Sequence, residues 1–291
     1  MLKIMPNRQR ERLSYKAVRT IAIFCLVFLG SCSDRKPDVS ISSQSSQQQT
    51  STSLLKTTYP KSYPLKLQTI GEFHGNEVQA KSGEQWLGLF ATPKGFELLP
   101  TKIMVNTVRD YVIDLDETKK TGKKVITNQK SQPIFLVKGA AYLKPGIVKT
   151  VFSEQQYLTP NKVLNLSLNS AIDGDYQIAI EDKQNLENKE FSFERQSNTK
   201  TRKYIISVSD NSSTSQNLQE FKHHYSNNEL PSDRKPPSVF WAGDLDRDGK
   251  LDLLIELASH ANVSSLTLLL SSPAKENKLL EPVAQFVTQG C

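Results

Sequence analysis

Apolar and polar residues alternate in short runs along most of this chain, and turn residues separate the runs. From about Tyr59 onward the alternation has the period of two that is typical of β-strands, and we find no convincing 3.6-residue period of an amphipathic helix. The strands that we predict cover residues 85–90, 102–108, 111–115, 123–127, 133–137, 162–168, 175–180, 191–193, 203–208, 238–242 and 251–257. Runs of this length and spacing predict an all-β domain with the architecture of a sandwich or a barrel.

The first 31 residues break this pattern. A basic and polar segment, residues 1–19, is followed by an apolar run from Thr20 to Leu29 and then by Gly30-Ser31-Cys32. A membrane-spanning helix needs about 20 apolar residues, and this run has about half that length. A basic flank, a short apolar run and small residues before a cleavage point predict an export signal over residues 1–31.

Leu29-Gly30-Ser31-Cys32 resembles the bacterial lipobox, in which the cysteine is diacylated and becomes the new N-terminus. The resemblance implies lipidation of Cys32 and attachment to a membrane of the cell envelope. Ser33 implies sorting to the outer membrane in Gram-negative cells, with the protein facing the periplasm or the surface. Residues 32–58 are rich in Ser and Gln and predict a flexible linker. We expect residues 59–291 to form the globular domain, in which a break near residue 160 would separate two sub-domains.

Charge and cysteine content narrow the classes of function. The net charge is +7, but residues 1–31 hold six of the 37 basic residues and one of the 30 acidic ones. The chain from Cys32 onward therefore has 31 basic and 29 acidic residues, a balance that argues against nucleic acid as a partner. Because Cys25 lies in the leader and Cys32 would carry lipid, only Cys291 is left, and no internal disulfide can form. Cys291 is a buried side chain, a free thiol or the partner in an intermolecular disulfide.

The clearest chemical signal is the segment Gly243-Asp244-Leu245-Asp246-Arg247-Asp248-Gly249-Lys250-Leu251-Asp252. Four carboxylates in nine residues repel one another unless a cation lies between them. Alternate positions of a tight loop can direct their oxygens inward, and Ca²⁺ takes 6–8 oxygen ligands. We predict a calcium site formed by the side chains of Asp244, Asp246, Asp248 and Asp252 and by the backbone carbonyl of Lys250.

The loop differs from an EF-hand, because its twelfth position is Ile255 instead of glutamate. Strand-like runs flank it, and in the second we expect Leu251, Leu253, Ile255 and Leu257 to share one face. The loop resembles the Asp-x-Asp-x-Asp-Gly-x-x-Asp sites of FG-GAP and integrin-type β-repeats, but it occurs once and supports only the ion site. The chain end is also similar to that of uncharacterised bacterial lipoproteins with the same loop, a resemblance that implies no activity.

Other polar groups have simpler interpretations. His223-His224 could bind a transition metal, but consecutive strand residues point to opposite faces, so we expect a surface pair. We expect His74 to be a hydrogen-bonded loop residue, and we expect Trp86 and Trp241 to pack in cores. The lysine-rich segment 119–124 could hold an anion, but neighbouring carboxylates balance its charge and favour a solvated hairpin turn.

The sequence contains none of the common hydrolase, zinc-protease, redox, phosphate-binding or dinucleotide-binding motifs. We therefore expect a lipid-anchored envelope protein whose β domain is braced by Ca²⁺ and serves as a binding or structural module, with an envelope protein or polymer as its partner. The alternative is a periplasm-facing hydrolase that acts on envelope polymers, with catalytic groups scattered over several loops. A concave pocket holding a histidine or carboxylate with a shifted pKa would favour the enzyme, whereas an exposed apolar patch would favour the binding module.

Overall fold

The computed structural model describes residues 62–160, 162–168, 175–184, 200–225, 236–258 and 262–290. Within these ranges the chain forms strands and turns and no helix, so none is available there to cross a membrane. The predicted leader 1–31, Cys32, the linker 32–58 and Cys291 lie outside the described residues. The prediction of an all-β fold is confirmed.

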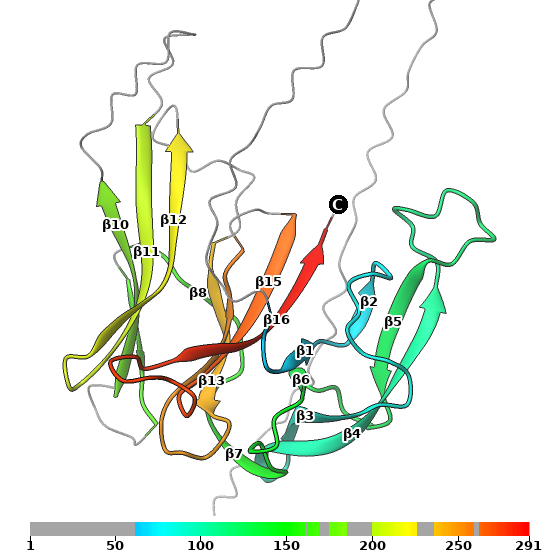
Figure 1. Cartoon of the computed structure of the whole chain (residues 1–291), viewed down its shortest axis with the longest axis horizontal. Coiled ribbons are helices and arrows are strands. Elements are labelled where there is room, and N and C mark those ends of the chain that lie inside the picture. Colours follow the sequence, from blue (N-terminus) through cyan, green and yellow to red (C-terminus); the bar gives the residue numbers. More distant parts are fainter. Residues whose placement is uncertain are drawn as a thin grey trace, which may run out of the picture. The chain divides into compact units, whose positions relative to one another are not determined.

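Twelve strands belong to one large antiparallel sheet (Figure 1). They are β1 (Lys66–Gln68), β2 (Gly71–Phe73), β3 (Gln85–Thr92), β4 (Gly95–Val108), β5 (Gly122–Thr127), β6 (Phe135–Lys138), β7 (Gly146–Phe152), β8 (Gln156–Tyr157), β13 (Ser238–Asp244), β14 (Asp252–Glu256), β15 (Val263–Leu270) and β16 (Glu281–Gln289).

The order of the main path is β1-β6-β3-β4-β7-β13-β14-β15-β16, while β2 and β5 extend β4, and β8 pairs with β13. The two ends of this path meet, because the N–H of Leu65, just before β1, donates to the carbonyl of Val283 in β16 at 3.0 Å. The sheet is therefore nearly closed, as in a barrel, which satisfies the edge groups that an open sheet exposes.

A smaller sheet has the strand order β12-β11-β10-β9. Its strands are β9 (Val163–Leu166), β10 (Tyr176–Gln184), β11 (Lys200–Asp210) and β12 (Ser215–Tyr225), and all pairings are antiparallel. The chain thus leaves the large sheet after β8 and returns to it at β13. The predicted strand 191–193 lies outside the described residues.

Two buried clusters meet at β14, where the predicted alternation is confirmed. Leu254 packs into the cluster that contains Trp241 and Phe135, inside the large sheet. The four residues predicted to share the other face, from Leu251 to Leu257, pack into a second cluster together with residues of the small sheet, such as Ile178. Because apolar residues pack against both faces of β14, the position of this strand is fixed, and with it the end of the aspartate loop before it. The expected burial of Trp86 and Trp241 is confirmed as well, with exposed fractions of 2% and 0%.

The prediction of a strand at 111–115 is wrong. Strand β4 ends at Val108 and β5 begins at Gly122, so this apolar run lies in the loop between them. The side chain of Asp110 accepts the N–H groups of Val112 and Ile113, and that of Asp114 accepts the N–H groups of Asp110 and Thr121. Aspartate side chains that bind nearby backbone N–H groups stabilise turns in competition with strands.

Candidate metal centre

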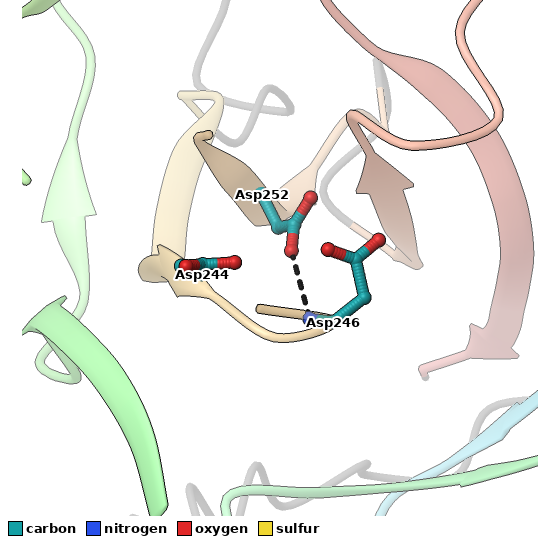
Figure 2. Close-up of side chains that lie close together, drawn as sticks. All are labelled: Asp244, Asp246 and Asp252. Atoms are coloured by element: carbon teal, nitrogen blue, oxygen red, sulfur yellow. Dashed lines mark hydrogen bonds between the residues drawn. The ribbon is translucent and has the colours of Figure 1, made fainter. Parts of the chain in front are cut away.

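The aspartate loop connects two paired strands of the large sheet. Asp244 is the last residue of β13, Asp252 is the first residue of β14, and Gly243 pairs with Asp252 in the ladder. The intervening residues turn tightly, so that the carboxylates of Asp244, Asp246 and Asp252 point toward one another (Figure 2). Strand pairing therefore fixes two of the three aspartates, and the turn brings the third to them.

Two residues of the loop adopt a left-handed backbone conformation, Arg247 with φ 66° and Gly249 with φ 83°. Glycine takes this conformation without strain, which explains Gly249. Arg247 is held there by its side chain, since its Nε donates to the carbonyl of Ile147 at 3.0 Å and its Nη2 to that of Lys144 at 2.8 Å. The guanidinium group thus ties the loop to the start of β7.

Gly243 serves a different purpose, the close approach of β7. A Cβ atom at this position would lie 2.3 Å from the carbonyl oxygen of Lys149 and 2.5 Å from the ring of Trp241. Only glycine fits such a contact, so the glycine before the first aspartate is required for the packing of β7 on β13.

One carboxylate oxygen from each of Asp244, Asp246 and Asp252 can be chosen so that all three lie within 4.8 Å of one another. Asp252 is fully buried and organises the loop. Its Oδ2 accepts the N–H of Leu245 at 2.7 Å, and its Oδ1 accepts the N–H and the hydroxyl of Ser271 at 2.8 and 3.0 Å. This aspartate has partners for both oxygens without any ion.

Asp244 has a different environment. Its side chain is 8% exposed, and its Oδ2 accepts the N–H of Gly249 at 3.1 Å. Its Oδ1 is buried and has no hydrogen-bond partner among the described residues. An unpaired buried carboxylate oxygen costs several kcal/mol unless a proton or a cation compensates it. The lone pairs of this oxygen could therefore coordinate a cation.

The electrostatics agree with this picture. Burial and the charges of Asp248 and Asp246 raise the pKa of Asp244, against hydrogen bonds from the backbone of Gly249 and Arg247. Burial, followed by the charge of Asp246, raises the pKa of Asp252 well above its usual value, against the hydrogen bonds from Ser271 and Leu245. No ion pair joins these three aspartates to a basic side chain in the described part of the chain. The group could therefore hold a metal ion.

Asp248 and Lys250 lie farther out than the other three predicted ligands. Both are exposed, and the Asp248 carboxylate accepts the Ser271 hydroxyl at 2.9 and 3.0 Å and the Lys250 N–H at 2.8 Å. The same hydroxyl also donates to Asp252, so Ser271 bridges Asp248 and the group of three aspartates. The structure thus brings together Asp244, Asp246 and Asp252 and leaves Asp248 at the rim.

Sequence reasoning missed Ser271 and Ser272, which follow β15. The Ser272 hydroxyl donates to Asp246, in the same way that Ser271 bonds to Asp248 and Asp252. These serines reach the loop because Leu253 pairs with Leu269, a register that places the end of β15 beside the start of β14. Only the run of two serines could have drawn attention to them, and such runs are common in turns.

A second concave feature lies near the C-terminal strand. His74, Glu77 and Tyr63 line a pocket of about 720 Å³, with Gln289 at its edge. The Nδ1 atom of His74 binds the Asp110 carboxylate, and the ring also donates a hydrogen bond to the backbone carbonyl of Gln289. The expectation of a hydrogen-bonded loop histidine is confirmed, and the Asp110 hydrogen bond raises its pKa.

Two of the predicted candidates remain, the histidine pair of β12 and the lysines of the β4–β5 loop. His223 and His224 follow each other in β12, but their side chains are outside the described part. Lys119 and Lys120 are exposed in the loop between β4 and β5, as expected of a solvated hairpin connection.

Comparisons with known proteins give no match, since no family model, no curated protein and no solved structure is similar enough to this chain. The site must therefore be interpreted from its own chemistry.

Proposed function

We propose that this protein is a lipid-anchored lipoprotein of the bacterial cell envelope, in the outer membrane, whose β domain binds one Ca²⁺ and acts as a binding or structural module. The lipobox-like sequence ending at Cys32 supports the anchor. Asp244 belongs to a group of three carboxylates and has a buried Oδ1 without a hydrogen-bond partner among the described residues, which supports the ion and is the observation on which the proposal rests.

Calcium suits this group better than other common metals. Every side-chain donor is a carboxylate or hydroxyl oxygen, and hard oxygen donors favour Ca²⁺ or Mg²⁺ over zinc and copper. Ca²⁺ accepts irregular sets of 6–8 oxygens, whereas Mg²⁺ requires near-octahedral geometry. Asp244, Asp246 and Asp252 would hold the ion, while Asp248 shares the Ser271 hydroxyl with Asp252 at the rim.

The ion would brace the fold. It would join the end of β13 to the start of β14, and through the Asp252–Ser271 hydrogen bonds it would also support the end of β15. A cation here neutralises charges that otherwise oppose folding, and it binds only the folded chain.

Thermal unfolding tests the ion site. At calcium concentrations about 100-fold above the dissociation constant, binding stabilises the fold by about 2.7 kcal/mol, so the Tm should rise by several degrees relative to chelator. Mg²⁺ should raise it less. Asp246→Ala should abolish the rise, whereas Asp116→Ala, which removes an exposed turn aspartate, should keep it. An unchanged Tm of the native chain in calcium and in chelator would contradict the proposal.

Mass spectrometry of the protein purified from its native membranes tests the anchor. We expect an N-terminal peptide that begins at Cys32 and carries acyl chains. A peptide that still contains residues before Cys32, or an unmodified Cys32, would contradict the anchor and leave the ion site unaffected.

Crosslinking in intact envelopes followed by purification tests the binding role. A protein or polymer recovered with the native chain and lost after calcium removal would support a module whose surface depends on the ion. The pocket beside His74 meets the criterion for the alternative of a hydrolase, because it holds a histidine whose pKa is raised.

A further inference from the structure

The loop between β4 and β5 presents the densest group of exposed apolar side chains in the described part of the chain. Tyr111, Val112, Ile113 and Leu115, here called the apolar tip, are 80%, 53%, 56% and 95% exposed. In Figure 1 this loop extends beyond the ends of β4 and β5. Exposed apolar side chains in such a concentration mark interaction sites.

The apolar tip is held in a fixed shape. Asp114 is 3% exposed and binds the Asp110 N–H at 2.8 Å, the Thr121 N–H at 2.9 Å and the Thr121 hydroxyl at 2.6 Å. The backbone N–H of Asp114 returns a hydrogen bond to the Asp110 carbonyl at 2.8 Å. Buried polar groups therefore order the loop, while Tyr111 and Leu115 are largely exposed and the half-exposed Val112 and Ile113 also line the pocket beside His74.

The charges around the tip have a small positive excess. Residues 109–124 contain five basic side chains, and of the four acidic ones Asp110 and Asp114 are buried inside the loop. At the surface, Asp116 and Glu117 lie in the same loop as Lys119, Lys120 and Arg109. Glu117 is 3.9 Å from Arg109, and Glu72 of β2 forms an ion pair with Lys124. Lys119, Lys120 and Lys123 have no ion pair with any acidic side chain that the structure describes. An anionic surface is the complementary partner.

We propose that the apolar tip inserts into the anionic phospholipid bilayer to which the protein is anchored, with the neighbouring lysines at the lipid headgroups. This inference rests on the proposed lipid anchor. A linker of the length of residues 32–58 has a root-mean-square span of about 30 Å, which keeps the domain at a high effective concentration near the bilayer.

A bilayer explains the tip better than a protein partner does. A stable protein interface buries roughly 800 Å² on each side, and four side chains on a projecting turn form a small convex surface. A bilayer needs no matching shape, and it accepts an aromatic residue and apolar side chains flanked by lysines.

The test uses the full lipoprotein in vesicles of phosphatidylcholine with phosphatidylglycerol. An environment-sensitive fluorophore is attached at Leu115→Cys, in a Cys291→Ser background, and for the control at Lys94→Cys, in the exposed β3–β4 turn at the other end of β4. We expect a blue shift and quenching by lipid-borne quenchers at position 115, and neither effect at position 94. Each lysine neutralised by Lys119→Gln or Lys120→Gln should lower lipid partitioning about fivefold.

A triple variant, Tyr111→Ser, Val112→Ser and Ile113→Ser, should lose the shift at position 115 and keep its Tm, because these side chains are exposed. A label at position 115 that stays in water while the protein is anchored would overturn the inference. So would a label buried only in native envelopes and never in protein-free vesicles, which would indicate a protein partner. If Cys32 carries no lipid, the proposed anchor fails. The insertion of the tip can then be tested separately, by mixing the same chain with anionic vesicles. Burial of the label at position 115 would support the insertion, and a label that stays in water would contradict it.

Discussion

Two buried aspartates, only eight positions apart, have opposite relations to their surroundings. Asp252 has hydrogen-bond donors on both oxygens, whereas one oxygen of Asp244 has none among the described residues. Asp252 therefore has partners in the fold without an ion, and Asp244 is the residue whose unpartnered oxygen would gain most from a bound cation. The spacing in the sequence cannot distinguish the two aspartates, because it gives no information about their hydrogen bonds.

Replacing Asp244 by Asn separates these roles. In chelator the Asp244→Asn variant should be as stable as the native chain or more stable by up to about 1 kcal/mol, because burial no longer opposes a charge. Calcium should then raise its Tm little or not at all. Asp252→Asn is the matched comparison, and it should lower the Tm in chelator because it disturbs acceptors for Leu245 and Ser271. A full calcium response of Asp244→Asn in thermal scans would contradict this assignment.

His74 gives the fold a pH dependence of defined sign. The hydrogen bond to Asp110 raises the pKa of His74, and the hydrogen bond from His74 lowers the pKa of Asp110. The pair stabilises the fold fully above the unfolded pKa of Asp, about 4, and below that of His, about 6.5. Its contribution disappears as the pH rises through the raised pKa of His74.

Denaturant unfolding between pH 5 and pH 9 measures this contribution. The native chain should lose stability across that range, and His74→Gln should be less stable by about 1.5–3 kcal/mol at pH 5, with a smaller difference at pH 9. Equal differences at both pH values would show that the charge of His74 does not matter.

Among the elements, the loop between β4 and β5 shows where sequence patterns mislead. The run from Tyr111 to Leu115 has strand composition, yet Asp110 and Asp114 direct their side chains to nearby N–H groups and stabilise a turn. Alternation signals a strand only where one face can be buried, and no element covers this run. The strand β14 was predictable because both of its faces meet apolar neighbours.

Asp114 is the residue on which the order of this loop depends. Asp114→Ala removes the acceptor of three hydrogen bonds, from the Asp110 N–H and from the N–H and hydroxyl of Thr121. Limited proteolysis should then cut within residues 109–121 much faster than in the native chain, with a loss of stability of about 1–3 kcal/mol. Lys119→Ala, which changes an exposed side chain of the same loop without an ion pair among the described residues, serves as the control and should be cut at the native rate. Unchanged cleavage of Asp114→Ala would show that the strands alone order the loop.

For the whole molecule, the class of fold followed from the sequence and the order of strands did not. Strand β7 pairs with β4 and with β13, which begins more than eighty residues later. Such long-range pairing depends on how the side chains of whole sheet faces pack together, and the alternation of apolar and polar residues does not specify that packing. The same limit hid Ser271 and Ser272, which reach the aspartate loop only through the register of β14 and β15.

The two clusters that share β14 should unfold together. Leu254→Ala opens a cavity in one cluster and Leu253→Ala in the other, and each should cost about 2–5 kcal/mol. Because both cavities lie on one strand, tryptophan fluorescence and circular dichroism should report a single, coincident transition in either variant. Separate transitions for Leu253→Ala would show that the small sheet unfolds independently.

The double burial of β14 also has a consequence before folding. From Leu251 to Ala258 the chain is almost entirely aliphatic, and Asp252 and Glu256 are its only charges. In the unfolded chain these two charges oppose the aggregation of this hydrophobic segment with copies of itself. Only later do they become interior groups, with Glu256 accepting the N–H groups of Ala258 and Ser265.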